Sequence, residues 1–249
     1  MNDWVPGSNL EEKLKTLLVP SRFYIKNKLK RELKYGEKEL ALIPFLVDRE
    51  KSCLDIGANV GVYSELMSRY CDKVHAFEPN PKIYSILQRC AAHNVECHQI
   101  ALSDIDGNGE LRIPRSIKGH SNQGSSLSKV KVSDNFDVIT VPTTRLDSLD
   151  LGTIGFIKID VEGFELNVLQ GAIDTLAKNR PTLLIEMEER HTRQPLEQLV
   201  SSVESYDYQC LFLRKNKLSC FETMDIERCH RHPPTREDYV FNFIFLPTD

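Results

Sequence analysis

The stretch Ser52-Cys-Leu-Asp-Ile-Gly-Ala-Asn-Val-Gly-Val-Tyr63 decides the fold of this chain. Its start, up to Ile56, is typical of a buried parallel strand, and apolar residues return at helical spacing over residues 60–69. Between the two, Gly57 and Gly61 permit a sharp turn and a close approach of strand, helix and ligand. We therefore predict a strand, a glycine-rich turn and a helix, the unit with which nucleotide-binding α/β folds begin.

A second acid follows the first at an informative distance. The next apolar strand, residues 73–77, ends in Glu78-Pro79, about 20 residues beyond Asp55. A ribose-binding acid follows a nucleotide-binding turn at a similar interval. Glu78 is therefore our candidate for the ribose hydroxyls, with Pro79 beside it.

The glycine pattern favours one class of cofactor. The spacing Gly57-x-x-x-Gly61, with Ala58 and Asn59 inside the turn, differs from the G-x-G-x-x-G of dinucleotide folds. Asp55 stands just before the turn and would repel a pyrophosphate. S-adenosylmethionine has an ammonium, a sulfonium and a ribose but no phosphate, so it is the predicted cofactor. A nicotinamide-dependent sugar oxidoreductase is the alternative, and Asp55 argues against it.

The third strand places the adenine pocket. Residues 95–101 have strand character, and ligands of open parallel sheets lie beyond the carboxyl ends of the strands. Ala101 or Leu102 could pack on the ring, and Asp104 or a backbone group could meet its amine.

The pattern changes over residues 106–150. A turn at 106–109 and short alternating strands at 110–113 and 137–141 predict a small β insertion, and the polar stretch 119–126 joins them. Such a stretch is either a plain surface loop or a lid over the site.

A second informative stretch is Phe156-Ile-Lys-Ile-Asp-Val-Glu-Gly-Phe-Glu165. It predicts a buried central strand that delivers Lys158, Asp160 and Glu162 to its carboxyl end, beside the first turn. An ion pair between Lys158 and an acid is one interpretation, and a catalytic role for Asp160 and Glu162 is the one we favour. The next strand, 182–188, ends near Glu186 and His191, which border the same crevice. His191 could be a base or a substrate contact, although surface histidines are common.

Composition limits the class of protein. The chain has 249 residues, 41% of them hydrophobic, and a net charge of −4, so it can bury a full core and is not expected to bind nucleic acid. Seven irregularly spaced cysteines fit neither a disulfide framework nor a common zinc site, and we predict no metal centre. The polar N-terminus lacks a signal-peptide core, and no apolar run approaches a membrane span. We therefore expect a cytoplasmic protein.

The ends of the chain are less informative. A capping-box pattern at residues 8–11 precedes leucines at helical spacing, and residues 22–47 continue with helical material rich in lysine. We expect a helical extension over residues 1–48 and a single α/β domain over 49–249. The basic cluster could meet an anionic substrate or a lipid headgroup, but Glu32, Glu37 and Glu39 interrupt it, so we favour a solvated helix face.

Four segments together resemble the FkbM family of S-adenosylmethionine-dependent methyltransferases. They are Leu54-Asp-Ile-Gly-Ala-Asn-Val-Gly61, Phe77-Glu-Pro79, Ala101-Leu-Ser-Asp104 and residues 157–165 with the helix Val168-Leu-Gln-Gly-Ala172. The resemblance runs from about residue 35 to 185. It implies a doubly wound, Rossmann-like sheet of seven mostly parallel strands and methylation of a hydroxyl on a sugar, a lipid-linked glycan or a polyketide-type product.

The resemblance also implies residue roles. Asp55 would contact the methionine part of the cofactor, Glu78 the ribose, Asp104 or its neighbours the adenine, and Asp160 would lie near the reacting methyl. A hydroxyl needs a proton acceptor, for which Asp160 is our first choice, followed by Glu162 and Glu186. These three acids could instead hold a divalent cation, which their spacing does not require. A protein that binds S-adenosylmethionine without catalysis is a second alternative with the same fold. The sequence predicts no oligomeric state.

Overall fold

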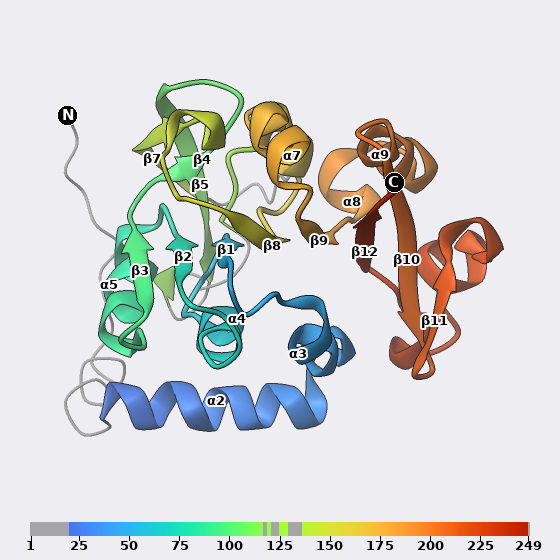
Figure 1. Ribbon diagram of the computed structural model, residues 1–249, viewed down its shortest axis with the longest axis horizontal. Helices are drawn as coiled ribbons and strands as arrows, with labels where there is room; N and C mark the ends of the chain where they lie inside the picture. Colours follow the sequence, from blue (N-terminus) through green and yellow to red (C-terminus); the bar gives the residue numbers. More distant parts are fainter. Residues whose placement is uncertain (1–19, 117–118, 121–124, 129–135, 249) are drawn as a thin grey trace.

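The computed structural model describes residues 20–116, 119–120, 125–128 and 136–248. Its centre is an eight-stranded sheet in the order β11-β10-β12-β9-β8-β1-β2-β3 (Figure 1). The strands are β1 (Ser52–Ile56), β2 (Val74–Phe77), β3 (Val95–His98), β8 (Ile154–Ile159), β9 (Thr182–Glu186), β10 (Tyr208–Arg214), β11 (Lys217–Cys220) and β12 (Asn242–Pro247). Five strands, from β9 to β3, pair in parallel, and β12, β10 and β11 add antiparallel pairs at one side.

The sheet has one strand more than the seven expected. The extra strand, β11, forms a hairpin with β10 across a turn in which Lys215 and Asn216 adopt φ of 50° and 60°. Two consecutive positive φ angles are those of a type I′ turn, whose twist suits a tight hairpin. The other seven strands form the predicted mostly parallel sheet.

Helices cover both faces of this sheet, as expected for a doubly wound fold. One face carries α4 (Val62–Met67), α5 (Pro81–Cys90) and α3 (Ile43–Leu46). Buried residues of α3 and α4 pack against Cys53, Val74 and Ile244 of the strands, and Leu87 of α5 packs against Ala76. The other face carries α6 (Glu165–Gln170), α7 (Ile173–Asn179) and α9 (Leu196–Glu204), which pack against Leu54, Ile157 and other strand residues.

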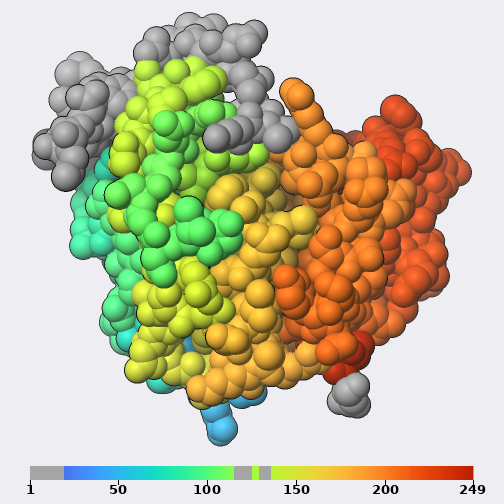
Figure 2. All heavy atoms as spheres, turned by 90° about the horizontal axis from the view of Figure 1, so that it is seen from above, coloured from blue at the N-terminus to red at the C-terminus, as the bar shows by residue number. Residues whose placement is uncertain are grey.

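The insertion forms a separate sheet of order β4-β7-β5-β6. Its strands are β4 (Ala101–Leu102), β5 (Gly107–Ser116), β6 (Gly119–His120) and β7 (Phe136–Thr144). The predicted continuous strand over 95–101 was wrong in one respect. Pairing with β2 ends at His98, and Ala101 already pairs with Thr143 of the insertion. Figure 2 shows the insertion, the β8–α7 segment and the C-terminal third side by side across one face.

Helical segments precede β1. They are α2 (Ser21–Tyr35), the 3-10 turn η1 (Lys38–Leu42) and α3. α2 lies outside α4 and α5 and contacts both (Figure 1). The capping box at 8–11 and the helix expected after it fall outside the described residues. A boundary between an extension and the main domain at residue 48 stays a prediction.

Candidate functional site

The turn after β1 is locked against the neighbouring strands. Gly57 has φ of 81°, and the backbone N–H groups of Gly57 and Ala58 both donate to the carbonyl of Phe77. A Cβ on Gly57 would lie 1.8 Å from the carbonyl oxygen of Asp160. Only glycine fits here, because the turn and the end of β8 are in backbone contact.

Glu78 follows β2 and faces the same turn. Its carboxylate accepts hydrogen bonds from the backbone N–H groups of Asn59 (3.0 Å) and Asn80 (2.9 Å). Asn59 adopts the left-handed φ of 51°, and Asn80 caps α5 by accepting from Lys82 N. Burial raises the pKa of Glu78 to about 7, although the two backbone donors oppose that shift.

A cleft opens beyond these strand ends. Its empty volume, with the solvent-open mouth included, is about 680 Å³. Its lining includes eight residues predicted from the sequence: Gly57, Asn59, Glu78, Pro79, Ala101, Leu102, Asp160 and Glu162. It also includes Ile100, from the segment expected to border the adenine, and residues that the sequence did not indicate individually: Ile56, Phe77, Ile83, Leu111, Ser125, Ser126, Leu127, Val161 and Phe164.

The insertion contributes directly to this cleft. The Ser126 hydroxyl lies within hydrogen-bonding distance of two carbonyls, those of Val161 (3.1 Å) and Glu162 (2.8 Å). Ser126 is buried, and its backbone pairs with Arg112 of β5. The described part of the polar stretch is therefore fixed to the turn after β8 and is part of the wall.

Several predicted cofactor residues do not line the cleft. Asp55 is buried beneath the turn, where its carboxylate accepts a hydrogen bond from the Ser64 hydroxyl of α4. Burial raises the pKa of Asp55 to about 6, and the Ser64 bond opposes this. Ala58 and Gly61 belong to the turn but lie outside the lining, and Ala58 packs against Ala76 and Leu87. Asp104 lies outside the lining and accepts from the Ser103 hydroxyl at 2.9 Å.

The acids after β8 form the other end of the cleft. Asp160 is half-buried, and burial raises its pKa to about 7, with the Glu162 charge adding to the shift and Lys158 opposing it. Glu162 occupies a left-handed φ of 58°, which is a strained backbone for a glutamate. Strain of this kind is often found at functional sites.

Lys158 lies buried beneath these acids. Its ammonium donates to Asn242 Oδ1 of β12 (3.3 Å) and to the Ile159 carbonyl, and it lies 5.3 Å from the centre of the Tyr63 ring. Burial disfavours the charged ammonium, but Asp160, Glu37 and other acids outweigh this and raise its pKa. The sequence predicts Lys158 at this strand end but not its contacts with Asn242 and Tyr63.

Glu37 connects the N-terminal helices to this polar cluster. One carboxylate oxygen accepts from the Tyr63 hydroxyl (2.6 Å) and from the Asn242 amide (3.0 Å). From the sequence, Glu37 is interpreted only as one of the acids that interrupt the basic cluster of residues 22–47. No local sequence signal indicates this contact, because Asn242 lies 205 positions away.

Glu186 and His191 join Glu162 at the end of β9. His191 is buried, in contrast to a common surface histidine, and its Nδ1 lies 3.3 Å from Glu162 Oε2. Burial and the nearby Asp160 charge raise the pKa of Glu186 to about 10. One ligand atom from each of these three residues lies within 4.8 Å of the others. Nitrogen and carboxylate donors at that spacing could hold a divalent cation.

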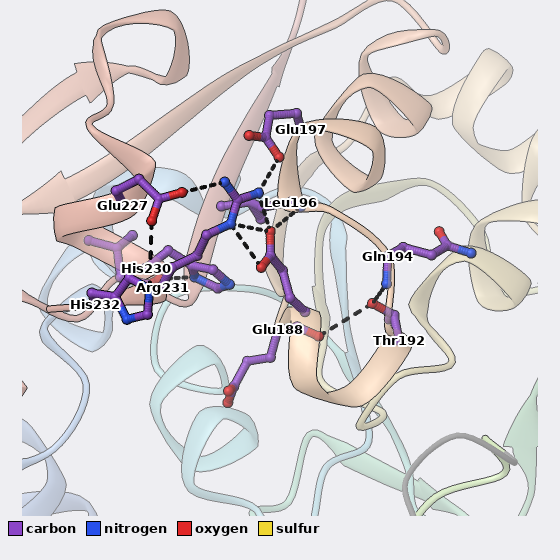
Figure 3. Close-up of polar contacts among 11 residues, drawn as sticks. Glu188, Thr192, Gln194, Leu196, Glu197, Glu227, His230, Arg231 and His232 are labelled. Carbon is purple, nitrogen blue, oxygen red and sulfur yellow. Dashed lines mark hydrogen bonds and ion pairs between the residues drawn. The ribbon is translucent and has the colours of Figure 1, made fainter.

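Residues 227–232 pack through Arg231 and the buried His230. Figure 3 shows Arg231 at the centre of ion pairs with Glu197 (2.8 Å) and Glu227 (2.9 Å), and Arg231 also binds Glu189. His230 has its Nδ1 at 2.7 Å from the Val240 carbonyl.

Among the described residues, the metal-ligand clusters are the one at Glu162, Glu186 and His191 and a second at His75, Glu96 and His98 on the β2–β3 edge. Neither cluster includes a cysteine, His230 or His232.

The chain is similar to known methyltransferases. The sequence profile of the methyltransferase FkbM domain matches residues 55–215. A protein named Methyltransferase 1, from Beauveria bassiana (strain ARSEF 2860), is 29% identical, with 49% of this chain and 58% of that protein covered. The chain spans about half the length of the relatives it matches.

Solved structures show the same fold. The methyltransferase FkbM from Methylobacillus flagellatus KT has a TM-score of 0.51 at 18% identity, covering 86% of this chain and 47% of that one. A methyltransferase from Streptococcus mutans in complex with SAH has a TM-score of 0.51 at 8% identity, covering 85% of this chain and 96% of that one. An rRNA methylase from Streptococcus thermophilus has a TM-score of 0.51 at 9% identity, covering 85% of this chain and 95% of that one.

Two expectations about partners concern membranes and nucleic acid. Within the described ranges, the structure has no helix both long and apolar enough to cross a membrane. The expectation that nucleic acid is not a partner gains no support, since one structural neighbour is described as an rRNA methylase.

Proposed function

The chain belongs to the family of FkbM methyltransferases, and from this premise we propose that it moves the methyl group of S-adenosylmethionine to a hydroxyl. The acceptor classes we propose are a sugar, a glycan or glycolipid, and a polyketide-like small molecule. One observation carries the proposal: Glu78 and Asp160 line the same cleft, on either side of the glycine turn. That arrangement suits a ligand with a ribose diol and a cationic centre, whereas the pyrophosphate of NAD would meet two acids.

The residues of the cleft fit this cofactor. Glu78 has carboxylate oxygens at the end of β2 to accept from ribose hydroxyls, and its two backbone donors hold it in place. Ala101 and Leu102 supply apolar contacts for the adenine. Asp55 acts from beneath the turn, where its charge favours the ammonium of the methionine part.

The bound cofactor supplies an electrophilic methyl group on a positively charged sulfur. Transfer of this methyl group to the acceptor oxygen would break the carbon–sulfur bond and leave the sulfur neutral. Glu78, Ala101, Leu102 and Asp160, which line the cleft, would hold the cofactor, and catalysis of this kind depends on holding the two reactants in a fixed orientation. Asp160 accepts the hydroxyl proton, and a pKa of about 7 suits a general base near neutral pH.

Glu162 lines the cleft at the acceptor end, and Glu186 and His191 lie next to it, outside the lining. Glu162 or His191 can receive the proton in place of Asp160, whereas Glu186, with a pKa of about 10, already carries a proton at neutral pH. The three residues can instead hold a divalent cation that would polarise the acceptor hydroxyl. The mixed nitrogen and oxygen donors within 4.8 Å of one another support the cation. His191 would then bind through neutral Nδ1, in place of its present contact with Glu162.

Calorimetric titration with S-adenosylmethionine and separately with NAD tests the cofactor. We expect micromolar binding of S-adenosylmethionine that is lost in Glu78→Ala, weakened in Asp55→Ala and unchanged in the exposed control Asp150→Asn. If NAD binds and S-adenosylmethionine does not, the chain is an oxidoreductase and the proposal is wrong.

Transfer of a labelled methyl group to a panel of glycans, glycolipids and polyketides tests the reaction. We expect Asp160→Asn to lower kcat by about 10²–10⁴-fold, with the affinity for S-adenosylmethionine changed by less than about tenfold. Binding without turnover on every acceptor would instead indicate a non-catalytic SAM-binding protein. Full activity after chelation, with Glu186→Gln also active, would exclude the cation.

A further inference from the structure

The helix α2 forms the outermost layer of one side of the molecule. It runs for 15 residues along α4 and α5, and its inner side is fixed by the buried Ile25 and Leu29 (Figure 1). Arg22 anchors its first turn through Glu65 and the Cys90 carbonyl, both at 2.6 Å. The helix is therefore a firm part of the fold with one long side facing outward.

Large apolar and aromatic side chains gather on and beside this helix. In the described part of the chain, nine such side chains are exposed, and five of them belong to residues 23–45. Phe23 is 60% exposed, Tyr35 73% and Phe45 84%, with Tyr24 and Leu33 beside them. More than half of the exposed large apolar side chains in the described residues therefore lie within this short segment, where they could enter an apolar phase together.

The same surface is strongly basic. α2 has six basic residues and one acidic residue, whereas the chain as a whole has a net charge of −4. Arg22 and Lys28 have acidic neighbours in Glu65 and Glu32. Lys26, Lys30 and Lys34 are exposed at four-residue spacing, so they form one stripe along the helix. We favour a solvated face on the sequence alone, but the structure shows Phe23 and Leu33 exposed on the same helix as these lysines.

We propose that α2, together with Phe45, docks the protein on an anionic lipid membrane, with the helix lying in the plane of the surface. Lysines meet the phosphates of the headgroups, while Phe23, Leu33 and Phe45 enter the boundary with the acyl chains. A second copy of this chain is a poor occupant, because a twofold contact would oppose two basic stripes.

A contact links the end of this helix to the buried polar cluster. Two residues beyond Tyr35, Glu37 contacts Tyr63 and Asn242, which lie beside Lys158. Docking of α2 on a membrane does not depend on the proposed function.

Sedimentation of the full chain with vesicles tests the proposal. We expect binding to vesicles of phosphatidylcholine with phosphatidylserine, weak binding to phosphatidylcholine alone, and release by high salt. The triple variant Lys26→Ala, Lys30→Ala, Lys34→Ala should lose at least about tenfold in partition coefficient, since each basic residue near an anionic surface contributes a few fold.

A matched triple variant, Lys178→Ala, Lys217→Ala, Arg236→Ala, removes three exposed cations elsewhere and should bind as the parent does. The double variant Phe23→Ser, Phe45→Ser should weaken the binding that remains at high salt.

Three outcomes would overturn the proposal: absence of binding to anionic vesicles, equal losses in both triple variants, or an RNA that binds more tightly than vesicles and is insensitive to the phenylalanine changes. Melting temperature and affinity for S-adenosylmethionine, measured on the same variants, show that each is folded. They also separate a failure of docking from a failure of the proposed function.

Discussion

The two ends of the cleft are built in different ways. At the cofactor end, each acid is held by hydrogen-bond donors within about 20 positions of it, as with Glu78 and the backbone of Asn59 and Asn80. At the acceptor end, Asp160 and Glu186 are balanced by the buried Lys158, whose own partner Asn242 lies 84 positions away. The first end depends on local hydrogen bonds and the second on a balance of distant charges.

The pKa values reflect the same difference in what opposes burial. Burial raises the pKa of acids at both ends, to about 6 for Asp55, about 7 for Glu78 and Asp160, and about 10 for Glu186. Hydrogen-bond donors are the largest opposing effect at Asp55 and Glu78, whereas the charge of Lys158 is the largest at Asp160 and Glu186.

The largest effect that tests this comparison is expected from Lys158→Met. Removing the ammonium leaves several buried acids without their cation, which should lower the free energy of unfolding by about 3–5 kcal/mol. Urea denaturation monitored by circular dichroism measures this. Lys178→Met, at an exposed site, should change stability by less than about 0.5 kcal/mol. Equal effects of the two variants would show that the acceptor end does not depend on this charge.

A smaller effect is expected at the cofactor end, from Gly57→Ala. The new methyl group meets the Asp160 carbonyl in a left-handed turn, and we expect a loss of about 2–3 kcal/mol together with loss of cofactor binding. Gly152→Ala is the matched control, because Gly152 has φ of 72° but nothing within 4 Å of its Cβ position. It should cost only backbone strain, about 1 kcal/mol. Similar losses in both would mean that the contact between the turn and β8 is unimportant.

The smallest effect concerns pH. Asp160 has a raised pKa of about 7, so it is charged above that pH and neutral below it. Its charge favours the sulfonium of S-adenosylmethionine but not the neutral sulfur of S-adenosylhomocysteine. The ratio of the affinity for S-adenosylmethionine to that for S-adenosylhomocysteine, measured by calorimetry, should fall by up to about tenfold from pH 8 to pH 6. Titration of Glu78 changes both affinities alike, so it does not change this ratio. A ratio independent of pH, or an unchanged profile in Asp160→Asn, would contradict the role of Asp160.

The contrast also explains what could be predicted from the sequence. The turn at Gly57, the acid Glu78 and the strands around them follow from hydrophobic periodicity and short spacings, and the structure brings most of these residues into one cleft. Glu37 and Asn242 could not be found in this way, since a contact between residues 205 positions apart has no local signature. The same holds for Ser126, whose hydroxyl is fixed by carbonyls of another segment.

The hydrogen bond between Glu37 and Asn242 has a consequence for synthesis of the chain. Asn242 belongs to β12, which inserts between β9 and β10. While the nascent chain is still on the ribosome, the strands that carry the glycine turn and Glu78 can pair before β12 emerges. Before β12 emerges, Lys158 lacks its hydrogen bond to Asn242, and β9 lacks its neighbouring strand β12. On the proposed function, cofactor affinity acquired during translation would therefore precede a working acceptor end, which is complete only once β12 has been added.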